Sequence, residues 1–133
     1  MLIDLTGKTA LVTGSTEGIG FAAAKGLAQA GGSVIVNGRS QEKVDAAVAR
    51  IGETKGAVRG IVADLADASG VDALIAALPQ ADILVNNAGI FQAGDFFDTD
   101  DATWDRHWQI NVMAGVRLSR HYLPRMEAKS GAG

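Results

Sequence analysis

The sequence predicts an α/β fold, a doubly wound parallel sheet in a three-layer α/β/α arrangement, with about four strands in the order 3-2-1-4. Two observations support this prediction. Short apolar runs alternate along the chain with longer segments whose apolar residues recur at helical spacing. Three of the short runs are apolar at consecutive positions, which is typical of parallel strands covered on both faces.

Four segments are expected to form strands. They are 9–13 (TALVT), 33–37 (SVIVN), 58–63 (VRGIVA) and 82–87 (DILVNN). A helix between consecutive parallel strands implies right-handed βαβ units. In the expected order, residues 83–85 lie at an open edge of the sheet, and an apolar edge of this kind favours pairing with another chain.

Three helices are expected between these strands. The residues expected to face the sheet are Ile19, Ala23, Leu27 and Ala30 on the first helix, Val44, Ala47, Val48 and Ile51 on the second, and Val71, Leu74, Ile75 and Leu78 on the third. Ser40 is expected to cap the second helix, because a serine hydroxyl accepts a hydrogen bond from the first helical turn.

A final long helix is expected from about Trp104 to Pro124, with N-cap candidates at positions 98–101. Its apolar residues are spread too widely for one narrow stripe. They are Trp108, Val112, Val116, Leu118 and Tyr122. This breadth predicts burial on two sides, against the sheet and against another subunit, and therefore a homo-oligomer.

The composition limits the classes of partner. Residues 1–133 have the length and hydrophobic content of one globular domain, with a net charge of −3 and no run of Lys or Arg, which argues against nucleic acid and membrane partners. There is no cysteine, and no metal site is expected. Neither a basic leader nor a long apolar segment is present, so we expect a cytoplasmic protein.

A glycine-rich turn follows the first expected strand. Gly14, Gly18 and Gly20 have the spacing G-x-x-x-G-x-G, which differs from both the G-x-G-x-x-G fingerprint and the P-loop. Glycines allow a sharp turn and close approach of a ligand, and the helix that follows offers free N–H groups to a pyrophosphate. An ordinary tight turn between a strand and a helix is the alternative interpretation.

Three motifs together resemble the short-chain dehydrogenase/reductase (SDR) family. They are TGSTEGIG at 13–20, NNAG at 86–89 and NV at 111–112. The resemblance covers essentially the whole chain but only about half of the usual length of the family. We therefore expect a single dinucleotide-binding Rossmann domain at 1–133, C-terminally truncated relative to the family, as part of a longer reductase.

The resemblance implies a set of cofactor-binding residues. The pyrophosphate and adenosine ribose would be bound by Gly14, Ser15, Thr16, Glu17, Gly18, Ile19 and Gly20, the adenine by Asp64 and Leu65, and the remainder by Asn87, Ala88 and Gly89. Asn111 matches the catalytic asparagine of the family, which kinks its helix and holds a water in the proton relay. Without the resemblance, Asn111 is only a polar residue within a helix.

The residues after the second strand bear on the choice of cofactor. A carboxylate there selects NAD by accepting the ribose 2′-hydroxyl, but Gly38 occupies this position. Arg39 and Ser40 follow and could bind the 2′-phosphate, which favours NADP(H). Glu17 argues the other way, because NADP-preferring relatives often carry a basic residue at its position. NAD(H) therefore stays open as an alternative.

The family's acid/base pair, Tyr-x-x-x-Lys, is missing from these residues. Tyr122 is the single tyrosine, Met126 stands four positions later, and Ser130 comes too early to match the catalytic serine. His107 and His121 are expected to be structural. We expect an NAD(P)(H)-dependent oxidoreductase acting on a small carbonyl or alcohol substrate, with its Tyr and Lys beyond residue 133.

Two other function classes remain open at this stage. The first is a non-catalytic nucleotide-binding or interaction module derived from the SDR family. The second is a dehydratase or epimerase on a related dinucleotide fold, which the NNAG motif disfavours. The 133 residues alone are expected to bind a dinucleotide weakly and to turn over no substrate.

Overall fold

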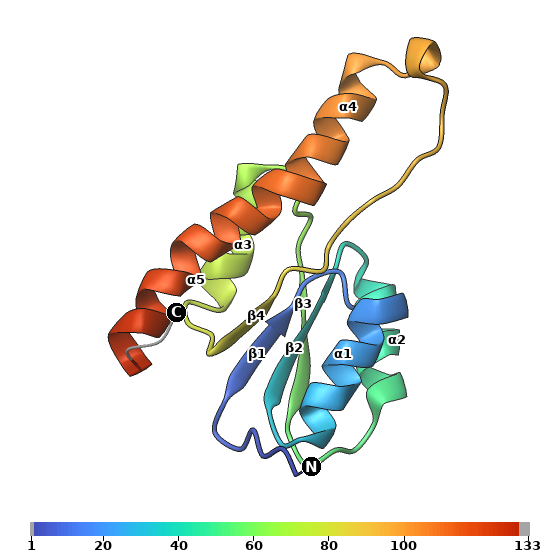
Figure 1. The fold of residues 1–133 in the computed structure, drawn as a ribbon. Helices are drawn as coiled ribbons and strands as arrows, with labels where there is room; N and C mark the ends of the chain where they lie inside the picture. The colour runs from blue at the N-terminus through green and yellow to red at the C-terminus, as the bar shows by residue number, and fades with distance from the viewer. Residues whose placement is uncertain (1, 131–133) are drawn as a thin grey trace.

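The sheet of the computed structural model has four parallel strands in the order β3-β2-β1-β4 (Figure 1). The strands are β1 (Thr9–Val12), β2 (Ser33–Gly38), β3 (Val58–Val62) and β4 (Ile83–Val85). The structure describes residues 2–130. The predicted fold class and strand order are confirmed, and β4 lies at an edge of the sheet as expected.

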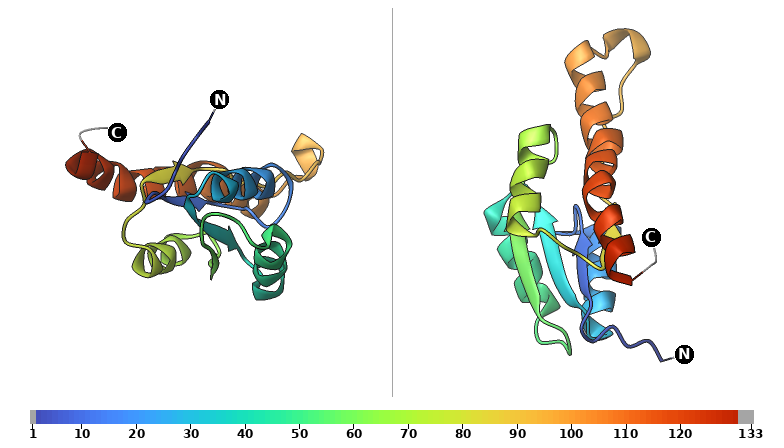
Figure 2. Two further views of the ribbon diagram at one scale, coloured as in Figure 1. Left: turned by 90° about the horizontal axis from the view of Figure 1, so that it is seen from below. Right: turned by 90° about the vertical axis from the view of Figure 1, so that its left-hand side faces the viewer.

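Helices cover both faces of the sheet. Helices α1 (Gly18–Gln29) and α2 (Gln41–Ile51) lie on one side, and α3 (Ala68–Ala77) and α5 (Ala114–Ser130) on the other (Figure 2, left). Within β1, Ala10 and Val12 belong to the core under α1 and α2, whereas Leu11 belongs to the opposite core. Strands buried on both faces explain why their apolar residues are consecutive.

The buried face of α1 differs from the predicted one. Of the predicted residues, Ala23 and Leu27 are partly buried against the core, as expected, whereas Ile19 is 84% exposed and Ala30 is the C-cap residue. The buried positions of the helix, which were not predicted, are Gly20, Ala24 and Ala28. Small residues let this helix approach the sheet closely. A Cβ at Gly20 would lie 2.7 Å from the carbonyl oxygen of Gly14. The faces predicted for α2 and α3 are confirmed.

The final helical segment is longer than predicted and contains a break in its hydrogen-bond pattern. Helix α4 (Asp101–Trp108) begins where the Asp100 carboxylate accepts a hydrogen bond from Thr103 N (2.9 Å). A π-helical turn, η2 (Gln109–Met113), then leads directly into α5. The family resemblance implied a kink at Asn111, but propensity gives no signal for a π-helical turn, so the form of the kink was not predicted. Figure 1 shows α4 extending beyond the end of the sheet.

Helix α5 does not end at Pro124, as was predicted, but continues to Ser130. Proline lacks the N–H that would extend the helical pattern. The Arg125 guanidinium donates to the carbonyl of His121 (2.7 Å), and Lys129 pairs with the Asp82 carboxylate (2.7 Å) beside β1. These contacts hold the last turns of α5 in place. No helix within residues 2–130 is long and apolar enough to cross a membrane.

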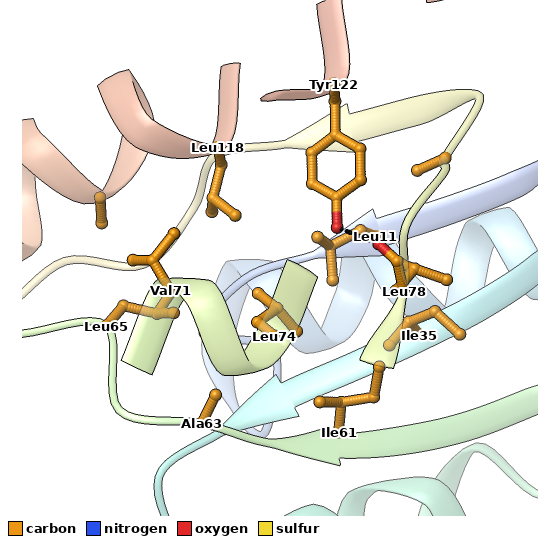
Figure 3. Close-up of a cluster of buried hydrophobic side chains, with 12 residues drawn as sticks. Leu11, Ile35, Ile61, Ala63, Leu65, Val71, Leu74, Leu78, Leu118 and Tyr122 are labelled. Atoms are coloured by element: carbon orange, nitrogen blue, oxygen red, sulfur yellow. Dashed lines mark hydrogen bonds between the residues drawn. The ribbon is translucent and has the colours of Figure 1, made fainter. Parts of the chain in front are cut away.

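Tyr122 anchors α5 to the core. Its side chain is fully buried, and its hydroxyl donates a hydrogen bond of 2.6 Å to the carbonyl of Leu78, at the end of α3 (Figure 3). Burial raises the pKa of Tyr122 to about 12. The lone tyrosine of the sequence is therefore a structural residue of the hydrophobic core.

Replacing Tyr122 by Phe tests this role. Tyr122→Phe is expected to lower the free energy of unfolding by about 1–3 kcal/mol near neutral pH, because the carbonyl of Leu78 loses its donor. The ordinary tyrosine pKa is near 10, so only the unfolded state ionises at first, and wild-type stability falls as the pH rises from about 10 to about 12. Tyr122→Phe lacks this pH-dependent loss of stability, because its side chain has no hydroxyl to ionise. Urea unfolding at both pH values measures the difference, and equal pH slopes would contradict the assignment.

Candidate functional site

A cleft of about 650 Å³ opens at the carboxyl ends of the four strands. This is where open parallel α/β sheets bind ligands. The cleft is lined by Gly14, Thr16, Glu17, Ile19, Asn37, Gly38, Arg39, Ser40, Lys43, Ala63, Asp64, Leu65, Asn87, Ala88, Gly89, Ile90 and Ile110. Residues at or just after the ends of all four strands therefore line one cavity.

The glycine turn after β1 brings two backbone segments into contact. Gly14 has a φ of 59°, and a Cβ there would lie 2.9 Å from the Cα of Ala88. Gly18 has a φ of 63° but has open space around it. Gly14 is therefore required both for its conformation and for its closeness to the β4 end, and Gly18 only for its conformation.

The N-terminus of α1 offers hydrogen-bond donors at the cleft. Glu17 occupies the N-cap position with extended backbone, yet its side chain makes no capping hydrogen bond. The first N–H groups of any α-helix lack partners within the helix, and they carry a partial positive charge. An uncapped helix N-terminus beside a glycine turn is suited to binding a pyrophosphate.

Hydrogen bonds between Thr13 and Asn87 join the ends of β1 and β4. The Thr13 hydroxyl oxygen accepts from the backbone N–H groups of Asn87 (3.1 Å) and Ala88 (2.9 Å). In return, the Asn87 amide donates to the carbonyls of Thr13 (3.1 Å) and Gly14 (3.0 Å). Thr13 was missed as a functional residue, although it begins the TGSTEGIG motif.

Ser15 and Asn37 join the glycine turn to β2 and β3. The Ser15 hydroxyl donates to the carbonyl of Val12 (2.7 Å) and accepts from Asn37 N (3.0 Å). The Asn37 side chain accepts from Gly14 N (3.3 Å) and donates to the carbonyl of Ile61 (3.2 Å). Both residues are buried, and the Ser15 hydroxyl is already engaged with the protein.

Asn111 lies within the π-helical turn η2 and binds the chain that follows β4. Its amide oxygen accepts from Ile90 N (2.7 Å), and its amide nitrogen donates to the carbonyl of Ile90 (2.9 Å). Ile90 and Ile110 line the cleft, whereas Asn111 does not. Such turns are frequent at functional sites. Here the turn fixes one wall of the cleft through Asn111.

The end of the cleft beside β2 is rich in charged and polar groups. Arg39 and Ser40 line it from the β2–α2 connection and Lys43 from the first turn of α2, and Glu17 lines the same cleft. Ser40 caps α2 as predicted, its hydroxyl accepting from Lys43 N (3.3 Å). At Gly38 a Cβ would lie 2.6 Å from the Thr16 methyl carbon, so any side chain there must displace Thr16.

A family model described as short chain dehydrogenase matches residues 8–133, nearly the whole chain. The chain belongs to the short-chain dehydrogenase family. Among curated relatives, this short-chain dehydrogenase is 46% identical to the uncharacterized oxidoreductase YvaG of Bacillus subtilis, over 98% of this chain and 51% of the relative. It is 39% identical to human dehydrogenase/reductase SDR family member 4, over 96% of this chain and 48% of the relative.

Solved structures give the same family relationship. L-sorbose reductase from Gluconobacter frateurii, complexed with NADPH and L-sorbose, superposes with a TM-score of 0.88 at 35% identity, covering 97% of this chain and 51% of the reductase. A metagenomic short-chain oxidoreductase in complex with NADP superposes with a TM-score of 0.84 at 32% identity, covering 94% of this chain and 59% of the oxidoreductase. The short-chain dehydrogenase chain thus spans about half the length of the curated relatives it matches.

The cleft brings together most of the residues predicted to bind a cofactor. Those that line it are Gly14, Thr16, Glu17, Ile19, Arg39, Ser40, Asp64, Leu65, Asn87, Ala88 and Gly89. Ser15, Gly18, Gly20 and Asn111 do not line it but shape the turn, the helix start and the wall behind it. Asn37, Lys43, Ala63, Ile90 and Ile110 line the cleft without having been predicted. Direct contact of each residue with a cofactor stays a prediction.

The two histidines lie outside the cleft. His107 accepts a hydrogen bond from Gln92 N at Nε2 (3.2 Å), and its Nδ1 lies 2.7 Å from the carbonyl oxygen of Thr103. The Nε2 of His121 lies 2.8 Å from the carbonyl oxygen of Pro79. Within residues 2–130, no group of three or more His, Cys, Asp or Glu residues is arranged to hold a metal ion.

Three glycine-to-alanine variants test the close packing of the turn. Gly14→Ala is expected to lose more than about 2 kcal/mol of unfolding free energy, because a strained backbone adds to a collision with Ala88. Gly18→Ala has open space and is expected to lose about 1–2 kcal/mol from the left-handed conformation alone. Gly26→Ala, inside α1 and also in open space, is expected to gain about 0.5–1 kcal/mol.

Chemical denaturation of the three variants ranks these effects. The order of stability should be Gly26→Ala, wild type, Gly18→Ala and then Gly14→Ala. Equal losses at Gly14 and Gly18 would show that contact with Ala88 contributes nothing.

Proposed function

We propose that this chain is the cofactor-binding half of an NADP(H)-dependent oxidoreductase that transfers a hydride between the nicotinamide and the carbon of a small carbonyl or alcohol substrate. The observation that carries the proposal is the contact between the Gly14 turn and Ala88 beside the uncapped N-terminus of α1. This arrangement gives an anion-binding floor to a cleft at the ends of parallel strands.

A dinucleotide fits the residues that are present. The cleft, at about 650 Å³, is within the usual range of small-molecule sites. A side chain at Gly14 or Gly20 would collide with the protein's own atoms, so these glycines let the turn pack closely against the end of β4 at the base of the cleft. Ile19 is apolar yet 84% exposed, and it lines the cleft, where an apolar ligand surface could cover it.

Each part of the cleft has a proposed role. Gly14 to Gly20 bind the pyrophosphate, Asp64 and Leu65 contact the adenine, and Asn87 to Gly89 line the nicotinamide half. When bound, the dinucleotide supplies or accepts the hydride. Asn111 holds Ile90 through two hydrogen bonds and so positions the wall nearest the reacting end. Its participation in a proton relay is carried over from the family resemblance.

The proton donor is proposed to lie outside these 133 residues. Tyr122 is buried in the core, its hydroxyl bonds the carbonyl of Leu78, and burial raises its pKa to about 12. It can neither reach the cleft nor donate a proton there. We therefore propose that the 133 residues alone bind a dinucleotide and turn over no substrate.

NADP(H) is the favoured cofactor. Gly38 leaves no carboxylate to select the ribose hydroxyl of NAD, and Arg39 and Ser40 line the same end of the cleft. The relatives solved with NADPH or NADP support this choice. Glu17 also lines the cleft and its negative charge disfavours a phosphate, so NAD(H) remains the alternative.

Oligomer formation is also proposed, through the outer face of α4, η2 and α5. Trp108, Val112 and Val116 lie along this face with 55%, 38% and 40% of their surfaces exposed. Trp104 extends the apolar surface on α4. Large apolar side chains exposed side by side favour an interface with another subunit. The family resemblance implies a dimer or a tetramer. A cytoplasmic location and a role as a non-catalytic binding module stay predictions from the sequence.

Binding and turnover of the purified chain test the functional proposal. Titration with NADPH is expected to show saturable binding, without NADPH oxidation on addition of small ketones. Absence of dinucleotide binding would overturn the proposal. Ketone reduction by a homogeneous preparation of this mass would contradict the placement of the proton donor outside these residues.

Replacing Gly38 by Asp tests the choice of cofactor. Gly38→Asp is expected to weaken NADP⁺ binding by about tenfold or more and to strengthen NAD⁺ binding, because a carboxylate repels the 2′-phosphate and accepts the 2′-hydroxyl. Gly38→Asn is the matched control, since it has the same size and displaces Thr16 equally. Equal effects of Asp and Asn would assign the change to displacement of Thr16 and contradict the charge argument.

A further inference from the structure

We infer that Lys43 is the second cation for the 2′-phosphate of NADP(H), in place of the basic residue that the glycine turn lacks at Glu17. This inference rests on the proposed function and deepens it. The sequence motifs did not point to Lys43, because it lies beyond the β2–α2 connection, inside the next helix.

The position of Lys43 is fixed by the start of α2. The Ser40 hydroxyl accepts a hydrogen bond from the backbone N–H of Lys43 (3.3 Å), which holds the first turn of the helix against the β2 end. Lys43 lines the same cleft as Arg39 and Ser40. The cap thus fixes the start of α2, and Arg39 and Lys43, on either side of Ser40, both line the cavity.

Neither cation has a partner within the described chain. Among residues 2–130, the ion pairs are Lys55 with Asp4 and Lys129 with Asp82, and no hydrogen bond involves the side chain of Arg39 or Lys43. A lysine in the first turn of a helix is also unfavourable for the fold, because the helix N-terminus carries a partial positive charge. A bound anion would compensate for both features.

The charge balance of the cleft explains why a second cation matters. The positively charged side chains that line the cleft are Arg39 and Lys43, and the negatively charged ones are Glu17 and Asp64. The net charge of the lining is therefore zero. Without Lys43 the cleft would carry a net negative charge against a ligand that is itself an anion. A phosphate monoester adds about 1.5–2 negative charges near neutral pH, so NADP(H) is affected more than NAD(H).

The Lys43→Ala variant tests this inference by equilibrium binding of NADP⁺ and NAD⁺ to the chain. Lys43→Ala is expected to weaken the binding of NADP⁺ by about threefold to tenfold and the binding of NAD⁺ by less than about twofold. The difference between the two should shrink at high salt. Lys43→Arg should retain the preference. Lys8→Ala is the matched control, because Lys8 is exposed and precedes the opposite end of β1.

The outcomes separate this inference from the proposed function. Equal loss for both dinucleotides, or no loss for either, would overturn the role of Lys43 while leaving the proposed function intact. Absence of binding of either dinucleotide by the wild-type chain would overturn both. As a converse test, Glu17→Gln should strengthen NADP⁺ binding more than NAD⁺ binding, because it removes the opposing charge from the same end of the cleft.

Discussion

The hydrogen bonds between Thr13 and Asn87 are the constraint on which the cleft depends. They join the turn after β1 to the end of β4 in both directions, through one buried hydroxyl and one half-buried amide. Each bond contributes only about 1 kcal/mol net, but leaving a buried partner unsatisfied costs more. The contact of Gly14 with Ala88 is possible only in this arrangement. Both walls of the cleft are therefore positioned by the same few atoms.

Several local features that do not favour folding by themselves gather in this one cleft. Ile19 is apolar and exposed, Glu17 leaves α1 without a side-chain cap, and Lys43 opposes the helix dipole of α2. Departures from local rules that converge on one site are expected at functional sites. A dinucleotide would cover Ile19, bind the free N–H groups at the N-terminus of α1 and neutralise the charge of Lys43. The same ligand thus accounts for three independent observations.

The sequence predicted the sheet well, because runs of consecutive apolar residues are a strong signal for strands covered on both faces. On α1 it identified Ala23 and Leu27, which pack against the core, but it missed the buried glycine and alanines, which give little hydropathic contrast. It also wrongly included Ile19, which lines the cleft. The family resemblance implied a kinked helix at Asn111, but no local pattern marks the form of the kink, a π-helical turn. Lys43 was missed because the cofactor motifs end at the β2–α2 connection, and only the fold shows that the first turn of α2 also lines the cleft.

The most direct test is an NMR titration of the backbone amides with NADP⁺. The account predicts shifts confined to the cleft, at residues 14–20, at Arg39 and Lys43, and at residues 87–90, with NAD⁺ shifting the same set except for Arg39 and Lys43. The outer face of α5 should stay unchanged. Absence of shifts in the glycine turn, or shifts concentrated on α5, would contradict the claim that this cleft binds the dinucleotide.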